Sequence, residues 1–346
     1  MKRLLLWLGL ALTFAVAAPP VLDSAVAPHA VRPAGINIEP GMRPWRWTGA
    51  NPDGWWCRAP ACNGVRNGTV FVDRELSLAA ELGAANVRVE FPWPLIEPER
   101  GRFDWRRVDY IVRAARRRHL QLQPILIYSP PWAAQQESDP PPAEAFAAFT
   151  RAVARRYRSS IRLFELWDEP DLGLYWSGDE ASYVNRVLVP GYRAVKAADP
   201  RARVVLAASQ KPDATWLQGI YRLGGGSSFD IASYHDYSGD RQVLQNAAIV
   251  QEVLREHRQL EKPIWLGEFG LQENGLADQR QRALIEAVLT EPAPIALAQW
   301  YAIRDDYNMT CCPPQAVLFE PYGLVTHSYR RKSAFAALRT LLRRRR

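Results

Sequence analysis

The sequence predicts a single α/β domain folded as a (β/α)8 barrel, the TIM-barrel architecture. Short apolar segments recur along the chain, and most are followed by a polar loop and then by a segment with helical periodicity. Strands that alternate with helices pair in parallel. The 346 residues accommodate one barrel of about 250 residues with extensions. No change in composition marks a second domain.

The eight predicted strands are short runs of apolar residues. They cover residues 35–38, 86–91, 123–128, 161–167, 203–208, 230–234, 263–266 and 296–303. Between them, apolar residues repeat at helical spacing. The clearest case is 105–119, where Val108, Ile111 and Ala115 lie at positions i, i+3 and i+7 while the arginines face outward. Further helices are predicted at 143–157, 181–198 and 279–289.

The positive charge of the chain is localised. There are 44 Lys and Arg residues against 36 Asp and Glu residues, a formal net charge of +8. Eight of the cations lie in residues 330–346, which contain no acid, so the rest of the chain is neutral. A neutral body argues against nucleic acid as a partner, because proteins that bind it present a basic face. Residues 343–346 are predicted to form a solvated basic tail.

The N-terminus has the composition of a cleaved secretory signal. A positive start is followed by an apolar run, residues 4–18, which ends at Pro19. The run is shorter than the ~20 residues of a membrane span, and Ala-x-Ala patterns at 15–17 and 25–27 offer cleavage sites. We expect residues 1–27 to be removed. The mature domain, 28–342, would then have no stable membrane span and be secreted, periplasmic or held in the cell envelope. A single membrane anchor is the alternative.

The four cysteines form two close pairs, Cys57 with Cys62 and Cys311 with Cys312. Export permits disulfides, and four cysteines allow three pairings that the sequence does not distinguish. The first and last strands of a closed barrel are neighbours, so the two loops that carry the cysteines share one rim, which a disulfide would stiffen. A four-cysteine zinc site is the alternative, although adjacent cysteines do not match zinc-ligand spacing. We predict no bound metal.

Reactive side chains are concentrated where the predicted strands end, and that face of a barrel carries its chemistry. They are Arg88, Glu90, Tyr128, Asp168, Glu169, His235, Tyr237, Glu268, Trp300 and Tyr301. Two of them, Glu169 and Glu268, follow the fourth and seventh strands and are accompanied by aromatic residues. This pair is the strongest indication of a catalytic site.

Four motifs stand in order along the chain. Residues 164–171 read Phe-Glu-Leu-Trp-Asp-Glu-Pro-Asp, and residues 264–270 read Ile-Trp-Leu-Gly-Glu-Phe-Gly. The other two are Arg88 with residues 93–105, and 322–325 with 331–338. Together they resemble the second-, fourth- and seventh-strand signatures and the closing segment of the retaining glycoside hydrolases of clan A, above all the cellulase-like and β-xylosidase-like families. The resemblance covers roughly residues 35–342.

The resemblance implies that Glu169 is the general acid/base and Glu268 the nucleophile. These residues are 99 positions apart, which corresponds to three βα units. Across a barrel mouth, two such carboxylates can approach the ~5 Å separation of retaining hydrolysis. Glu268 must be ionised, with Arg88 and Tyr237 as its expected partners. Glu169 must start protonated and later act as a base on water, and no metal or organic cofactor is required.

Asp168 departs from the clan pattern, which has asparagine before the acid/base. The asparagine amide donates to the sugar 2-hydroxyl, whereas an ionised Asp168 can only accept. An anionic Asp168 would help to keep Glu169 protonated while accepting a hydrogen bond from the 2-hydroxyl. Alternatively, the substrate differs at that carbon or the site is no longer catalytic.

Aromatic side chains bind the apolar faces of sugar rings by stacking. Trp132, Tyr175, Trp176, Trp216 and Trp300 lie at or just after predicted strand ends. His235 and Tyr237 are similar to a sixth-strand pair of the clan. We expect Arg88, Asp168, Tyr128, Trp132, His235, Tyr237 and Trp300 to bind substrate.

The sequence therefore predicts an exported retaining β-glycosidase that hydrolyses O-glycosidic bonds of a poly- or oligosaccharide by double displacement. Two alternatives stay open. One is a non-catalytic carbohydrate-binding protein on a glycosidase scaffold. The other is a transglycosidase, in which a sugar replaces water as the acceptor.

Overall fold

The computed structural model describes residues 30–38, 69–272, 277–308 and 318–345. The predicted signal, residues 1–27, and all four cysteines, Cys57, Cys62, Cys311 and Cys312, lie outside these ranges. No helix within them is long and apolar enough to cross a membrane.

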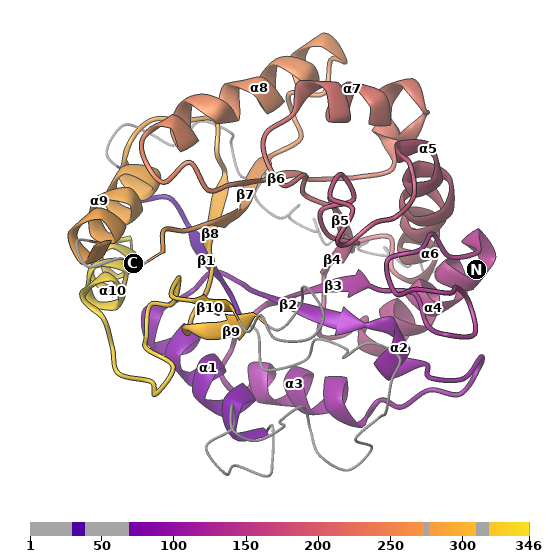
Figure 1. The fold of residues 1–346 in the computed structure, drawn as a ribbon, viewed down its shortest axis with the longest axis horizontal. Coiled ribbons are helices and arrows are strands. Elements are labelled where there is room, and N and C mark those ends of the chain that lie inside the picture. The colour runs from indigo at the N-terminus through magenta and orange to yellow at the C-terminus, as the bar shows by residue number, and fades with distance from the viewer. Residues whose placement is uncertain (1–29, 39–68, 273–276, 309–317, 346) are drawn as a thin grey trace, which may run out of the picture.

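Eight parallel strands form the barrel, as predicted (Figure 1). They are β1 (Ala34–Asn37), β2 (Val87–Pro92), β3 (Leu122–Ile127), β4 (Leu163–Leu166), β5 (Arg203–Leu206), β6 (Ala232–Asp236), β7 (Ile264–Phe269) and β8 (Leu297–Trp300). Each overlaps a predicted strand. Hydrogen-bonded pairing runs from β5 through β1 and β8 to β6, and isolated parallel bridges, Val205 with Ile231 and Ser209 with Tyr234, join β5 to β6 and close the ring.

Helices surround the strands (Figure 1). They are α1 (Thr69–Leu82), α2 (Trp93–Ile96), α3 (Arg106–Arg117), α4 (Ala143–Tyr157), α5 (Glu180–Tyr183), η1 (Val184–Leu188), α6 (Val189–Ala198), α7 (Ala214–Arg222), η2 (Gly225–Ser227), α8 (Gln242–Glu256), α9 (Ala277–Thr290) and α10 (Ser333–Arg344). Two short strands, β9 (Asp306–Asn308) and β10 (Leu318–Glu320), pair antiparallel outside the barrel sheet. Because α10 ends at Arg344, the first two residues of the predicted basic tail belong to a helix.

The helical pattern read from the sequence matches burial in α3. Val108, Ile111 and Ala115 are buried, whereas Arg113 and Arg116 are exposed. The predicted helix 181–198 is instead divided by the wider turn η1. There the Val189 N–H bonds to the Val184 carbonyl, five residues back. Pro190 follows and has no N–H to donate, which favours such a local change in winding.

A polar layer inside the barrel supports the mouth. Asn86 donates to Gln123 Oε1 at 2.7 Å, Gln299 donates to the same oxygen at 3.1 Å, and Gln123 donates to Glu165 Oε2 at 2.9 Å. Gly35 lies against this layer, and a Cβ there would meet Asn86 Oδ1 at 2.0 Å. The interior is therefore a packed, hydrogen-bonded platform that fixes Glu165 beneath the site.

Candidate active site

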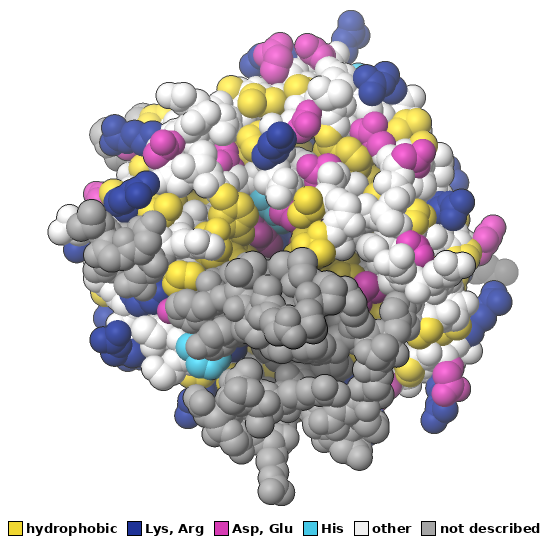
Figure 2. Space-filling view, in the orientation of Figure 1, with side chains coloured by type: hydrophobic (Ala, Val, Ile, Leu, Met, Phe, Trp, Pro, Cys, Tyr) yellow, Lys and Arg dark blue, Asp and Glu magenta, His cyan; other side chains and the backbone are white. Residues whose placement is uncertain are grey.

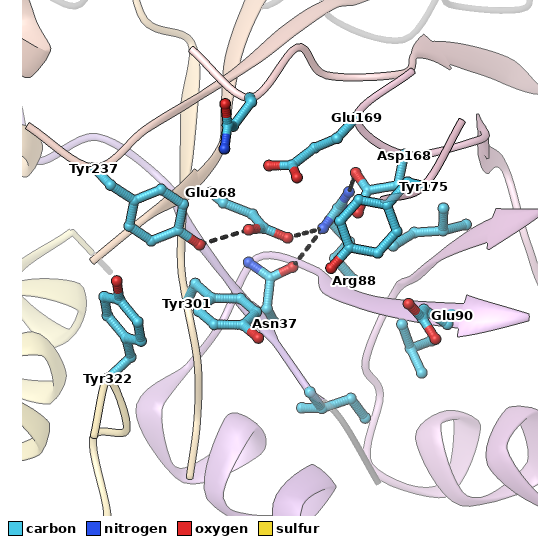
Figure 3. A pocket seen from close by; sticks show the side chains of 14 residues that line it. Asn37, Arg88, Glu90, Asp168, Glu169, Tyr175, Tyr237, Glu268, Tyr301 and Tyr322 are labelled. Carbon is cyan, nitrogen blue, oxygen red and sulfur yellow. Dashed lines mark hydrogen bonds and ion pairs between the residues drawn. The ribbon is translucent and has the colours of Figure 1, made fainter. Parts of the chain in front are cut away.

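A cavity of about 180 Å³ opens at the carboxyl ends of the strands. Figure 2 shows acidic side chains at the bottom of a hollow in this face, bordered by hydrophobic side chains. The cavity lining includes the polar residues Asn37, Arg88, Glu90, Asp168, Glu169, Gln210 and Glu268 and the tyrosines Tyr175, Tyr237, Tyr301 and Tyr322 (Figure 3). The predicted acid/base and nucleophile therefore share one cavity.

Arg88 is the centre of the charged cluster. It lies on β2, is 2% exposed, and donates through Nε and Nη2 to the two carboxylate oxygens of Glu165 at 2.7 and 3.0 Å. The same guanidinium donates to Asp168 Oδ1 at 2.6 Å and to Asn37 Oδ1 at 3.1 Å. Burial opposes its charge, but Asp168, Glu165 and Glu268 together raise the pKa of Arg88 well above its usual value. Arg88 is thus a permanent buried cation.

Glu268 lies on β7 with both carboxylate oxygens bound. Arg88 Nη1 donates to Oε1 at 2.5 Å, and the Tyr237 hydroxyl donates to Oε2 at 2.5 Å (Figure 3). Burial and the Glu268 charge raise the pKa of Tyr237 well above its usual value, so the phenol stays a neutral donor. These two bonds fix the orientation of the Glu268 carboxylate.

Glu169 follows β4 in a sharp turn. Its φ is 39° and that of Trp167 is 79°, both in the left-handed region that side chains rarely adopt. The turn is held by the Glu169 N–H, which donates to the Ala208 carbonyl at 3.0 Å. Such backbone costs on the order of 1–3 kcal/mol per residue and clusters at functional sites. It directs Glu169 into the cavity, where Oε1 lies 2.8 Å from His235 Nδ1.

One carboxylate oxygen of Glu169, one of Glu268 and a ring nitrogen of His235 lie within 4.8 Å of one another. Retaining glycoside hydrolases have their two carboxyl groups about 5–5.5 Å apart, whereas inverting enzymes need about 6.5–9.5 Å to leave room for water. The nearest oxygens of Glu169 and Glu268 are therefore closer together than the carboxyl separation of inverting enzymes.

His235 is fully buried on β6 and is surrounded by carboxylates. Burial alone lowers its pKa, but Glu268, Glu169 and Asp168 outweigh this effect and raise the pKa of His235 to about 9. The imidazole is therefore protonated at neutral pH, and its Nδ1–H donates to Glu169.

Two overlapping groups combine carboxylates with His235 in the manner of a metal-ligand set: Glu165, Asp168 and His235, and Glu169, His235 and Glu268. Arg88 already donates to three of these carboxylates, and a protonated His235 has no lone pair to offer a metal. Two buried cations, Arg88 and His235, thus already contact all four carboxylates and offset part of their negative charge. We assign neither group to a metal, and the metal-free reaction stays a prediction.

The model of the cellulase family, glycosyl hydrolase family 5, matches residues 75–302, well over half of the chain. The protein belongs to this family. It is therefore a glycoside hydrolase by family. No match to the chain is found among curated proteins.

Solved structures share the fold of this family 5 protein at low sequence identity. A family 39 glycoside hydrolase from Bacteroides cellulosilyticus WH2 has a TM-score of 0.63 at 16% identity, over 90% of this chain and 64% of that one. A GH5_18 protein from Streptomyces cattleya, solved with GlcNAc, has a TM-score of 0.66 at 19% identity, over 91% and 80%. A monomeric β-xylosidase from Caulobacter crescentus CB15 has a TM-score of 0.67 at 18% identity, over 90% and 69%. The chain thus spans under two thirds of the length of the first of these relatives.

Six residues predicted for the site, Arg88, Asp168, Glu169, His235, Tyr237 and Glu268, come together in this family 5 protein. Three other predicted residues do not line the cavity. Trp300 is 1% exposed, packs on Phe269 and donates to the Tyr322 carbonyl at 2.9 Å. The Tyr128 hydroxyl donates to Glu90 at 3.0 Å, and Trp132 packs on Trp93. Substrate contact by these three remains a prediction.

Four residues that shape the site, Asn37, Glu165, Tyr301 and Tyr322, were not among those predicted to catalyse or to bind substrate, although Tyr301 was named among the side chains at strand ends. Asn37 donates to the carbonyls of Gly267 and Trp300 at 3.2 and 3.3 Å while it accepts from Arg88. Glu165 anchors Arg88 from below the cavity. Tyr301 and Tyr322 form edge-to-face contacts with Tyr237 and with each other, which makes an aromatic wall beside Glu268 (Figure 3). The position of Tyr301 directly after β8 was the available signal in the sequence.

Proposed function

We propose that this family 5 protein is an exported retaining β-glycosidase that hydrolyses O-glycosidic bonds of a poly- or oligosaccharide. Glu268 is the nucleophile and Glu169 the general acid/base. The observation that carries the proposal is the carboxylate separation within 4.8 Å in one cavity. The similarity in fold to a β-xylosidase supports a β-glycoside as the substrate class.

In the first step, a Glu268 oxygen bonds to the anomeric carbon while the bond to the leaving oxygen breaks. Glu169 delivers its proton to that oxygen. The hydrogen bonds from Arg88 and Tyr237 hold the Glu268 carboxylate in place and orient its oxygens before attack. The product of this step is a glycosyl ester on Glu268 and an ionised Glu169.

In the second step, Glu169 takes a proton from water, and the hydroxide oxygen bonds to the anomeric carbon. The Glu268 ester bond breaks, and Glu169 is again protonated. The His235 Nδ1–H at 2.8 Å stabilises Glu169 while it is anionic between the two steps. Tyr237, Tyr301 and Tyr322 provide the aromatic surface on which a sugar ring would pack.

Product stereochemistry tests this proposal. Proton NMR of the newly formed reducing end should show the β-anomer first, before mutarotation. Glu268→Gln should abolish product, while Glu90→Gln, the same change at a cavity carboxylate outside the Arg88 cluster, should retain hydrolysis. The α-anomer appearing first would contradict a retaining mechanism.

Two further assays separate the alternatives. Oligosaccharide binding without any hydrolysis would favour the non-catalytic binding protein, for which Asp168 is the supporting feature. Products extended by an added acceptor sugar, in preference to hydrolysis, would favour the transglycosidase.

Export is tested on protein recovered from its native host. N-terminal sequencing should find a start at or shortly before residue 28 in the medium or envelope fraction. Non-reducing peptide mapping should find a disulfide among Cys57, Cys62, Cys311 and Cys312, whereas four free thiols would contradict this part of the proposal.

A further inference from the structure

Asp168 lies between two buried cations. Its Oδ1 accepts from Arg88 Nη2 at 2.6 Å and lies 3.7 Å from His235 Nε2. Asp168 is 7% exposed and His235 is 0% exposed. Nε2 is a fully buried polar atom without a hydrogen-bond partner among the described residues. The Asp168 carboxylate therefore lies beside a buried ring nitrogen that has no hydrogen-bond partner among the described residues.

The other ring nitrogen of His235, Nδ1, faces the two carboxylates that we propose to be catalytic. Nδ1 lies 2.8 Å from Glu169 Oε1 and 3.6 Å from Glu268 Oε2. The remaining titratable groups around the ring include a further buried carboxylate, Glu165, one oxygen of which lies within 4.8 Å of a His235 ring nitrogen and which Arg88 binds. The others are Arg88, Tyr237, which binds Glu268, and Asp171, whose pKa burial and Glu169 raise and His235 lowers. His235 thus connects Asp168 to Glu169 by direct charge contacts on its two sides.

We propose that Asp168 is a positioning residue that acts on Glu169 through His235. Held in place by Arg88, its carboxylate keeps the imidazole protonated with Nδ1–H directed at Glu169. The asparagine that the clan pattern has at position 168 would bring no charge to Nε2. The carboxylate of Asp168 therefore distinguishes this site from that pattern. The inference rests on the proposed role of Glu169 as acid/base.

The contact between Asp168 and His235 matters most after Glu268 has become a neutral glycosyl ester. Formation of the glycosyl ester removes the charge of Glu268, one of the four carboxylates that surround His235. Asp168 and Glu165 remain. Both oxygens of Glu165 are bound by Arg88, so Asp168 is the more available carboxylate for His235, which stays cationic while Glu169 is an anion before water attacks. The pKa of His235, raised to about 9 despite complete burial, agrees with a ring held in its charged form by these carboxylates.

The test compares Asp168→Asn with Asp236→Asn. Asp236 is adjacent to His235 on β6 but does not line the cavity, and its carboxylate accepts from the Ser238 N–H and from Asn246. We would label the five histidines with ¹⁵N, assign His235 by its loss in His235→Asn, and titrate each full-length variant by NMR. The alkaline limb of kcat/KM against pH is measured on the same samples.

Asp168→Asn should lower the His235 midpoint by about 1–3 pH units, because a charge within ~4–6 Å shifts a titration by that much. The alkaline limb should move in the same direction, and Asp236→Asn should leave both in place. An unchanged His235 midpoint in Asp168→Asn would overturn the inference, as would an equal shift in both variants. The NMR midpoint needs no turnover, so a failure of the proposed glycosidase activity would be recognised separately by the absence of product from the wild type.

Discussion

Arg88 binds Glu268 with one nitrogen, Nη1 to Oε1 at 2.5 Å, while its other two nitrogens hold the carboxylate of Glu165. The guanidinium is thus aimed by a buried partner that never reaches the cavity. Only the planar fork of arginine can make these contacts at once, because a lysine ammonium is a single point of charge.

Arg88→Lys should therefore lower kcat strongly while the protein stays folded. Loss of one preorganised donor to a reacting group costs about 10²–10³ in kcat, and the retained charge still compensates the buried carboxylates. Steady-state kinetics with circular dichroism as the folding control would check this. A near wild-type kcat in Arg88→Lys would show that the orientation of the guanidinium toward Glu268 is unimportant for catalysis.

Tyr237→Phe removes the hydroxyl that donates to Glu268 Oε2 and leaves the ring. A hydrogen bond to a charged group contributes about 1.5–3 kcal/mol, so kcat/KM should fall by about 10- to 100-fold. Rapid-quench measurement of the glycosylation rate would show whether the loss falls on the step that uses the nucleophile. An effect confined to release of product would contradict the assignment.

The contribution of His235 to folding should depend on pH. Its folded pKa of about 9 lies above the ordinary value of 6.5, so the protonated ring stabilises the native state fully below about pH 6.5. This contribution is lost as the pH rises through 9. Denaturant unfolding of wild type and His235→Asn should show a stability difference that shrinks between those two pH values. A difference that grows with pH would mean that the ring is buried neutral.

Trp300 and Tyr301 give a matched pair of substitutions. Trp300 is fully buried, so Trp300→Ala should cost about 3–5 kcal/mol of stability. Tyr301 lines the cavity, so Tyr301→Ala should raise KM with a smaller loss of stability. Thermal unfolding and Michaelis constants on both variants check this, and the reverse pattern would place Trp300 in the substrate site.

The barrel and the paired glutamates were predictable because each has a local signature. Apolar runs at regular spacing gave the eight strands, and Glu169 and Glu268 follow two of them within recognisable motifs. Asn37 carries no such signal, and Glu165, although it lies inside the 164–171 motif, was given no role there. They lie within predicted strands, and their role appears only when β1, β4 and β7 are brought around Arg88.

Trp300 and Tyr301 show why strand ends limit prediction from sequence. The eighth strand was predicted to run to residue 303, but β8 ends at Trp300. Successive side chains of an extended chain point to opposite sides, so of two neighbours at a strand end only one faces the cavity. The predicted stacking residue therefore lies in the core, and its neighbour lines the cavity.

Covalent trapping tests the central claim most directly. Mature protein would be incubated with 2-fluoro β-glycosides of glucose, xylose, mannose and galactose, beside Glu268→Gln and Glu90→Gln, and measured by intact-protein mass spectrometry. We predict one glycosyl adduct on wild type and on Glu90→Gln, mapped to Glu268 and missing in Glu268→Gln. An adduct on another residue, or hydrolysis of these sugars without any adduct, would contradict Glu268 as the nucleophile of a retaining glycosidase.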